Sequence, residues 1–223
     1  GPEALYHEII RQKRRQLTLV GASLPVAAAL FFITGCARRS MAGFIGGLVG
    51  GTLVAELIEK GELEYEDYSN QSMTLMFLAG ALGIPFIPTR TFLGSDFLSE
   101  DCINHPSGWL GDKKYQLADS PFTDEKVVLL PALRPDVALM HAQRADEEGN
   151  VQAWGALGDA KWALWAGEKV IVSVEEIVDS EVIRRDPNRT IVPSFKVSAV
   201  VHEPFGAHPT SITGYYDMDR PFL

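Results

Sequence analysis

The chain has 223 residues, of which 46% are hydrophobic, and it carries a formal net charge of −9 at pH 7. That length fits one large domain, and that apolar fraction is sufficient for a buried core. The negative charge argues against a nucleic-acid-binding protein, because phosphate backbones are held by clustered lysine and arginine. We therefore expect a single domain, residues 1–223, that binds no nucleic acid.

The two cysteines give no sign of a structural cross-link or a metal site. Cys36 and Cys102 lie far apart in the chain and share no spacing with other metal-binding side chains. We read no signal-peptide order of charged, apolar and cleavage-site regions near Gly1. We therefore expect reduced thiols in a cytoplasmic protein, with no metal and no other bound cofactor.

Two uncharged stretches, residues 16–37 and 41–55, raise the alternative of a transmembrane hairpin. Only three residues, including Arg38 and Arg39, separate the two stretches, which is a short connection to place beyond a bilayer. Strands that are covered on both faces also read as continuous apolar runs. We therefore interpret both stretches as buried strands and helices, and we expect no membrane association.

The first part of the chain alternates between strand and helix patterns. Leu5, Ile9 and Ile10 share one face of an amphipathic helix. Repeated strand, helix, strand units predict a parallel sheet. In chain order we expect a helix at 4–15, a strand at 17–20, a helix at 24–35, a strand at 41–45, a glycine-rich loop at 46–51, a helix at 53–60, a strand at 63–68 and a helix at 71–82.

From residue 85 to residue 121 the pattern gives way to Pro, Gly, Asp and Ser. Loops of this length are uncommon unless they serve a function, so we expect a long irregular surface excursion that covers a substrate or contacts a partner chain. The strand and helix alternation then returns, and the whole predicts an open, doubly wound, mostly parallel α/β sheet. The later elements are strands at 127–130, 137–141 and 151–154, a helix at 159–166, a strand at 170–174, and a β-rich segment at 191–201 that Pro193 interrupts.

The most informative run is RPDVALMHAQRADEEGNVQAWGALGD, residues 134–159. Asp146 to Asn150 reads as a polar turn in which Gly149 permits a positive φ. On these residues alone the run predicts a hairpin. As a string, with an apolar strand, a His-Ala-Gln element, an acidic-Gly-Asn turn and a Trp-Gly pair in this order, it resembles the A (alpha) subunits of class I CoA-transferases of the glutaconate type.

Other segments follow the order of the same family, so the resemblance extends over nearly the whole chain. They are EIIRQ (8–12) with LTL (17–19), GELEYEDYS (61–69), GIPFIPTR (83–90), VEEIV (174–178), IRRDPNRT (183–190), PFGAHP (204–209) and GYYDMDRPFL (214–223). The resemblance implies the class I CoA-transferase type of sheet, with a further N-terminal strand before Gly1.

The resemblance also implies a two-chain enzyme with a coenzyme A thioester as co-substrate. In this class the B (beta) subunit supplies a glutamate that attacks an acyl-CoA, and forms first an anhydride and then a glutamyl-CoA thioester. The CoA then passes to a carboxylic acid, which we expect to be dicarboxylic or a 3-oxo acid. No catalytic residue is expected in this chain, and we expect a hetero-oligomer of A2B2 or larger.

The A (alpha) subunit would supply the acid-binding side of a cleft between the chains. Gly46 and Gly47, in the glycine-rich loop, are candidate residues because glycine amides can approach a carboxylate closely. Ser69, Asn70 and Gln71, at the start of a helix, are the other candidates. The structural alternative is that the glycines form a tight turn and Ser69 caps the helix.

Two histidines and two glutamates complete the set of candidates. His208 is a possible cleft residue, and His141 lies at the end of an expected strand, where α/β sites form; the alternative for both is a structural histidine. Glu59 and Glu147 each precede a glycine by two positions, but we interpret them as a helix end and a hairpin turn.

The main alternative function is a two-chain CoA-thioester or ring-opening hydrolase of the same fold. Related ring-cleaving hydrolases carry a glutamate near the position of Asn70, where it acts as an acid or base. An amide cannot transfer protons in that way. Asn70 therefore favours the transferase.

Overall fold

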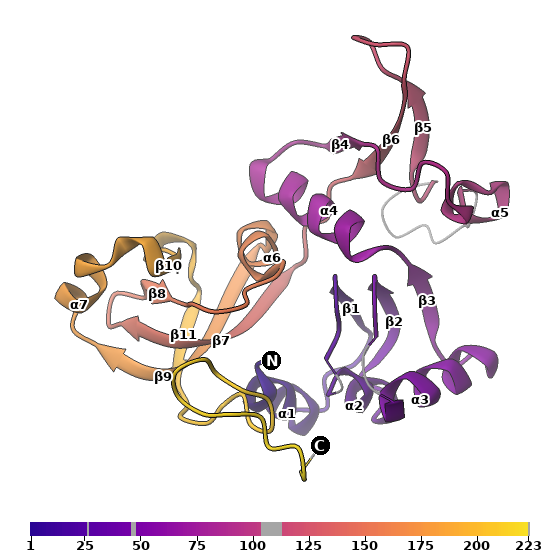
Figure 1. The fold of residues 1–223 in the computed structure, drawn as a ribbon. Helices are drawn as coiled ribbons and strands as arrows, with labels where there is room; N and C mark the ends of the chain where they lie inside the picture. The colour runs from indigo at the N-terminus through magenta and orange to yellow at the C-terminus, as the bar shows by residue number, and fades with distance from the viewer. Residues whose placement is uncertain (26, 46–47, 104–112, 223) are drawn as a thin grey trace.

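The computed structural model describes residues 1–25, 27–45, 48–103 and 113–222, and its strands form three sheets (Figure 1). The first sheet contains β1 (Leu17–Gly21), β2 (Ala37–Ala42) and β3 (Glu64–Asp67), in that order and all parallel. Helix α2 (Ala28–Ile33) connects β1 to β2, and α3 (Leu48–Glu59) connects β2 to β3. These strand, helix, strand units confirm the parallel arrangement predicted for this part of the chain.

Three helices pack against the first sheet. They are α1 (Glu3–Arg11), α2 (Ala28–Ile33) and α3 (Leu48–Glu59). Phe31 of α2 is buried, and the ring of Tyr6 from α1 meets it edge-on, with 5.4 Å between centroids. The apolar runs of the sequence therefore supply a protein core. No helix in the described ranges is long and apolar enough to cross a membrane.

Strand β2 begins four residues earlier than predicted. We expected a strand at 41–45, with the arginines before it as part of a short connection between two uncharged stretches. Arg38 and Arg39 are instead exposed residues of the strand, and Arg39 pairs with Glu64 of β3 at 3.0 Å between Nε and Oε2. Cross-strand charge pairs of this kind make arginine acceptable in a strand.

Helix α4 (Asn70–Leu82) lies across the carboxyl ends of the first sheet (Figure 1). Ser69 is its N-cap: the Ser69 hydroxyl accepts from the Ser72 amide at 3.1 Å, and the Ser72 hydroxyl accepts from the Ser69 amide at 3.0 Å. Two otherwise unpaired amides are thus satisfied at once. Gly83, with φ of 73°, ends the helix, so the predicted helix and its serine cap are both confirmed.

The expected irregular excursion at 85–121 contains two strands. β4 (Phe86–Thr89) and β5 (Gln116–Asp119) pair on either side of β6 (Lys126–Pro131), all antiparallel. The prolines made the β4 segment read as a loop in the sequence. Pro88 is nevertheless tolerated in β4 because β4 is an edge strand. The β5–β6 hairpin projects from the body of the molecule (Figure 1).

Between β4 and β5 the described residues include two short helices, η1 (Asp96–Leu98) and α5 (Glu100–Ile103). Their surroundings are aromatic: the rings of Phe92 and Phe97 stack at 4.4 Å, and the Phe92 and Tyr115 centroids are 5.1 Å apart. These rings belong to the core cluster that also contains Tyr68 and Met76, so the first part of the excursion packs against the body of the molecule.

The remaining strands form a mixed sheet with the order β10-β8-β7-β9-β11. β7 (Val137–Asp146), β9 (Lys169–Val178) and β11 (Ala199–His202) are parallel, whereas β8 (Val151–Gln152) and β10 (Thr190–Val192) run antiparallel to their neighbours. The α/β class with mostly parallel pairing is confirmed. The parallel strands are divided over two sheets, which local sequence periodicity does not specify.

Short helices complete this second part. They are α6 (Ala160–Ala166), α7 (Ser180–Arg185), and the 3-10 turns η2 (Pro187–Arg189) and η3 (Ser194–Lys196). Pro193 precedes η3 and ends β10, an edge strand, so the predicted interruption by proline is confirmed.

The predicted turn at Asp146 to Asn150 is confirmed as the β7–β8 hairpin. Asn150 donates its amide to Asp146 Oδ1 at 2.8 Å and its side-chain Nδ2 to Asp146 Oδ2 at 2.9 Å. Gly149 has φ of 95°, a conformation that favours glycine. Asp146 also accepts from the Ser180 hydroxyl at 2.9 Å, which fixes α7 on the hairpin.

Helix α4 packs closely against α6 and against the connection between β6 and β7. A Cβ atom added to Gly80 would lie 2.1 Å from the Leu133 carbonyl oxygen and 3.2 Å from Cβ of Ala166. The Leu133 amide also donates to the Met76 carbonyl at 3.0 Å. Glycine is therefore required at position 80 for α4 to approach α6 and the β6–β7 connection.

We expect Gly80→Ala to lower the free energy of unfolding by about 1–3 kcal/mol, because the added methyl group overlaps backbone that cannot move freely. Chemical denaturation of the purified chain measures the change. Leu82→Ala, on the same helix but 61% exposed, is the control and should cost much less. Equal losses in the two variants would contradict the packing argument.

Candidate functional site

The ends of the three parallel strands meet at the start of α4. Ala22 follows β1, Gly43 follows β2, and Ser69 lies two residues after β3. The Gly43 amide donates to the Ala22 carbonyl at 3.2 Å, and the Tyr68 amide donates to the Ala42 carbonyl at 3.0 Å. The carboxyl edge of a parallel sheet is the usual place for a site in α/β proteins.

Gly43 is the point of closest approach at this edge. A Cβ atom there would lie 2.4 Å from the Asn70 amide nitrogen, 2.5 Å from Asn70 Oδ1 and 2.6 Å from the Ser69 carbonyl carbon. Any larger residue would push β2 away from the first turn of α4. Sequence patterns did not indicate Gly43, since a lone glycine after a strand gives only a weak signal.

The first turn of α4 presents free donors. Asn70 and Gln71 are exposed, and within the described part of the chain no acceptor is found for either main-chain amide. Such amides, together with the helix dipole, favour a bound anion. Ser69, Asn70 and Gln71 thus share one surface, whereas Gly46 and Gly47 lie outside the described residues.

Asp159 brings the second half of the chain to the same edge. Its Oδ2 accepts from the Ala22 amide at 3.1 Å, from a position directly before α6. Sequence reasoning missed this contact, although Asp159 is the last residue of the run at 134–159. A carboxylate that satisfies the first amide after β1 fixes α6 against the strand ends.

Two buried charged side chains lie at the end of β3, next to the start of α4. Lys114 is 6% exposed and Glu66 is 3% exposed. The Lys114 ammonium donates to the Asp67 carbonyl and lies 4.5 Å from the centroid of the Tyr68 ring. Burial lowers the pKa of Lys114 and raises the pKa of Glu66, while the opposite charges of the two groups act against both shifts.

His141 lies within β7 and not at a strand end. It is 5% exposed, its Nε2 is 2.6 Å from Glu175 Oε1, and its Nδ1 is 2.7 Å from the Ser173 hydroxyl. Burial lowers the pKa of His141, although Glu175 acts in the opposite direction. The arrangement fits a neutral imidazole that donates from Nε2 and accepts from the serine at Nδ1. Ser173 has no exposed surface, so this group is structural and not a nucleophilic site.

Glu175 is the centre of this buried network. It also accepts from the Tyr216 hydroxyl at 2.6 Å and from the Phe205 amide at 2.9 Å. Burial raises the pKa of Glu175, but these donors and His141 outweigh that effect, so its pKa is lowered. The network anchors the C-terminal segment on the mixed sheet.

Gln143 and Trp154 have a similar structural role. The Gln143 side chain accepts from the Trp154 amide at 3.3 Å, and donates to the Trp154 carbonyl at 2.9 Å and the Thr213 carbonyl at 3.3 Å. The guanidinium groups of Arg144 and Arg189 lie 5.4 Å and 4.6 Å from the Trp154 ring. The His-Ala-Gln and Trp-Gly elements therefore hold the fold together.

His208 is half-buried and pairs with Asp219 at 3.0 Å within the C-terminal segment. Among the described residues, no contact joins His208 to Ser69, Asn70 or Gln71. The structure therefore does not bring His208 together with the start of α4.

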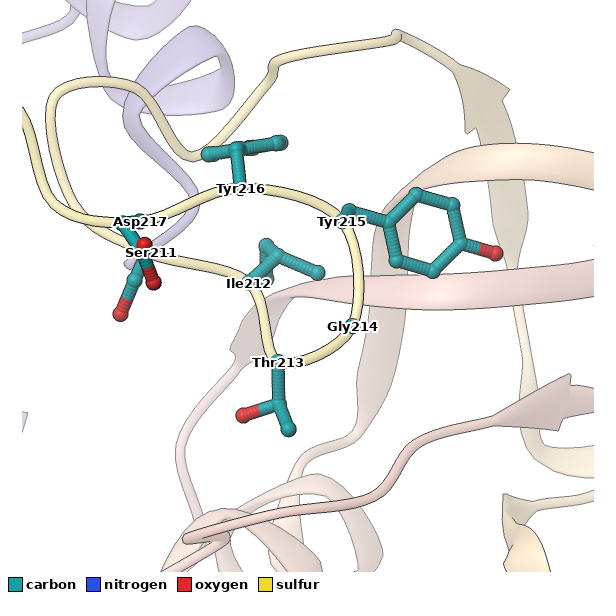
Figure 2. Close-up of a pocket in the computed structure, with 7 residues that line it drawn as sticks. All are labelled: Ser211, Ile212, Thr213, Gly214, Tyr215, Tyr216 and Asp217. Carbon is teal, nitrogen blue, oxygen red and sulfur yellow. The ribbon is translucent and has the colours of Figure 1, made fainter.

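The C-terminal segment also forms a shallow hollow, at residues 211–217 (Figure 2). A single turn lines it, closed by the Ile212 amide donating to the Tyr216 carbonyl at 3.1 Å. Thr213, Tyr215 and Tyr216 point in different directions (Figure 2). A site needs convergent polar groups, and this hollow lacks them.

Comparisons with known proteins show the family to which the chain belongs. Residues 1–203 match the coenzyme A transferase family. The chain is 37% identical to the A-type subunit of the 3-oxoadipate CoA-transferase of Pseudomonas knackmussii over 226 residues, 99% of this chain and 76% of that protein. It is 41% identical to the A-type subunit of the glutaconate CoA-transferase of Acidaminococcus fermentans over 170 residues, 74% of this chain and 53% of that protein.

A crystal structure of glutaconate CoA-transferase from Acidaminococcus fermentans superposes with a TM-score of 0.88, at 34% identity over 99% of this chain and 72% of the matched chain. A cholesterol ring-cleaving hydrolase subunit of Mycobacterium tuberculosis is more distant, at 30% identity over 172 residues, 73% of this chain and 55% of that protein. The chain therefore belongs to the coenzyme A transferase family, as an A-type subunit.

The buried network makes the stability of the chain depend on pH. The pKa of His141 in the folded chain is lowered from 6.5. The stability that this residue contributes is therefore complete above pH 6.5 and is lost as the pH falls through the folded pKa. The pKa of Glu175 is lowered from 4.5, so its contribution to stability is lost in turn as the pH falls below 4.5. We expect denaturation midpoints to fall from pH 7 to pH 5, and His141→Gln to flatten this dependence.

His141→Gln should also lower the free energy of unfolding at pH 7 by about 1–3 kcal/mol, because it breaks buried hydrogen bonds. The exposed His7→Gln variant is the matched control for loss of a histidine outside this network. A His141→Gln profile parallel to that of the wild type would show that His141 is not the group responsible.

Proposed function

We propose that this chain combines with a B-type partner to move CoA between an acyl-CoA and a dicarboxylic acid, including 3-oxo dicarboxylic acids. The observation that carries the proposal is the start of α4, where free amides and exposed polar side chains meet at the carboxyl edge of the parallel sheet. Two relatives are named for 3-oxoadipate and glutaconate, and both of these acids are dicarboxylates.

The start of α4 suits a carboxylate and not a reacting thioester. The amides of Asn70 and Gln71 can donate to carboxylate oxygens, and the helix dipole favours the negative charge. Ser69 uses its hydroxyl to cap the helix, so it holds these amides in place. The role that we propose for Ser69, Asn70 and Gln71 is to hold the acid while the partner subunit performs the covalent steps.

In the proposed reaction a glutamate carboxylate of the partner chain attacks the thioester carbonyl and expels CoA as a thiolate, leaving an acyl-glutamyl anhydride. The thiolate attacks the glutamyl carbonyl, releases the first acid and forms a glutamyl-CoA thioester. The acceptor acid then reverses these two steps. No glutamate of this chain is assigned a covalent role, and Glu66, the glutamate nearest α4 along the chain, is buried.

A second candidate function is hydrolysis of a CoA thioester or ring compound, since a hydrolase subunit is among the relatives. Position 70 separates the two functions, because a hydrolase needs a group that transfers a proton to or from water, and Asn70 cannot do so. The transferase is therefore preferred, as a cytoplasmic hetero-oligomer of A2B2 or larger.

The complex with the B (beta) subunit tests the reaction. We expect acyl-CoA to be converted only when an acceptor acid is present, because the CoA must be transferred to that acid. Chromatographic separation of CoA esters measures the products. Release of free CoA at the same rate without acceptor would favour the hydrolase, and full transferase activity of this chain alone would contradict the two-chain mechanism.

A matched pair of substitutions tests the acid site. Ser69→Asn and Ser69→Asp both keep a good N-cap, but only Ser69→Asp adds a negative charge where the acid would bind. We expect the KM for the acid to be at least about tenfold higher in Ser69→Asp than in Ser69→Asn, because like charges repel. Thermal denaturation should give similar midpoints for the two complexes. Equal KM values would place the acid elsewhere.

A further inference from the structure

Lys114 is a buried cation that the proposed covalent chemistry does not use. Its ammonium is surrounded by aromatic rings, with Nζ at 4.5 Å from the centroid of Tyr68, 5.8 Å from Tyr115 and 5.9 Å from Phe97. Rings at these distances stabilise a cation through their quadrupoles. The side chain is thus held in one place, and its direct hydrogen bond goes to the Asp67 carbonyl.

That hydrogen bond fixes the chain immediately before the start of α4. Asp67 is the last residue of β3, and only Tyr68 separates it from the Ser69 cap. Tyr68 is 1% exposed, and its hydroxyl donates to Glu66 Oε2 at 3.3 Å. Lys114 therefore holds the backbone of residue 67 and one face of residue 68, on which the position of Ser69 depends.

The same side chain attaches the folded excursion to the first sheet. Lys114 lies two residues before β5, and its neighbour Tyr115 donates its hydroxyl to the Phe97 carbonyl. The Lys114 ammonium thus adds a polar contact between this part of the chain and the end of β3, beside the apolar core that Tyr115 shares with Tyr68.

The charges around Lys114 are balanced and local. Glu66 and Asp67 favour its protonated form, against the effect of burial. Glu66 Oε1 is buried and has no hydrogen-bond partner in the described ranges, so loss of the cation would leave an uncompensated buried carboxylate. Position 114 therefore supplies both a donor to the Asp67 carbonyl and a group whose positive charge offsets the Glu66 carboxylate.

We propose that Lys114 is a positioning residue for the acid site: it sets the geometry of Ser69, Asn70 and Gln71 through the Asp67 carbonyl and the Tyr68 ring. This inference rests on the proposed function of that site. Lys114 does not touch the reacting atoms. Its removal should weaken binding of the acid while the covalent steps of the partner chain with the acyl-CoA continue.

The test compares Lys114→Met with Lys114→Arg in the complex with the partner chain. Methionine keeps an unbranched apolar side chain and removes the charge, whereas arginine keeps a cation that can donate to the Asp67 carbonyl. We expect Lys114→Met to raise the KM for the acid by about tenfold or more, as displacements near 1 Å cause large losses at such sites. The KM for the acyl-CoA should change less than about twofold, and Lys114→Arg should recover most of the loss in acid binding.

Thermal denaturation of the same complexes separates positioning from a merely structural role. If Lys114→Met lowers the midpoint but leaves the KM for the acid unchanged, the proposal is overturned. It is also overturned if Lys114→Arg behaves like Lys114→Met, because the charge would then not matter. If the Ser69→Asp and Ser69→Asn complexes differ in acid KM while Lys114→Met has no effect, only this inference fails and the proposed function stands.

Discussion

The close packing of α4 is the constraint on which the rest of the structure depends. At its first turn, Gly43 leaves no room for a side chain, so the end of β2 touches the backbone of Ser69 and Asn70. In its last turn, Gly80 lies against the Leu133 carbonyl. One helix is thereby fixed at both ends by contacts that only glycine allows, and the three sheets are arranged around it.

This arrangement explains why the start of α4 is available as a site. A helix that lies across the ends of parallel strands points its first amides at the edge where the strand loops meet. Ser69 satisfies the Ser72 amide, whereas the amides of Asn70 and Gln71 remain free among the described residues. The same geometry that stabilises the helix end thus leaves donors for a carboxylate.

The polar residues of the mixed sheet have a different role from those at α4. His141, Gln143 and Glu175 are buried and satisfy one another or the backbone of the C-terminal segment. Asp146 and Asn150 close the β7–β8 hairpin in the same manner. The residues of the run at 134–159 therefore build the scaffold, whereas the proposed acid site lies at the end of the GELEYEDYS segment, on another sheet. Recognisable motifs need not coincide with the reacting groups.

The sequence by itself determined the α/β class, the hairpin at Asp146 to Asn150, the helix that Ser69 caps, and the family, because each depends on local propensity or on a string of residues. It did not reveal β4, since prolines on an edge strand look like a loop. Only the tertiary structure decided that the parallel strands form two sheets, that Gly43 meets Asn70, and that Lys114 reaches Asp67 across 47 residues of chain. These are contacts between distant segments, and their geometry arises from packing that no local pattern records.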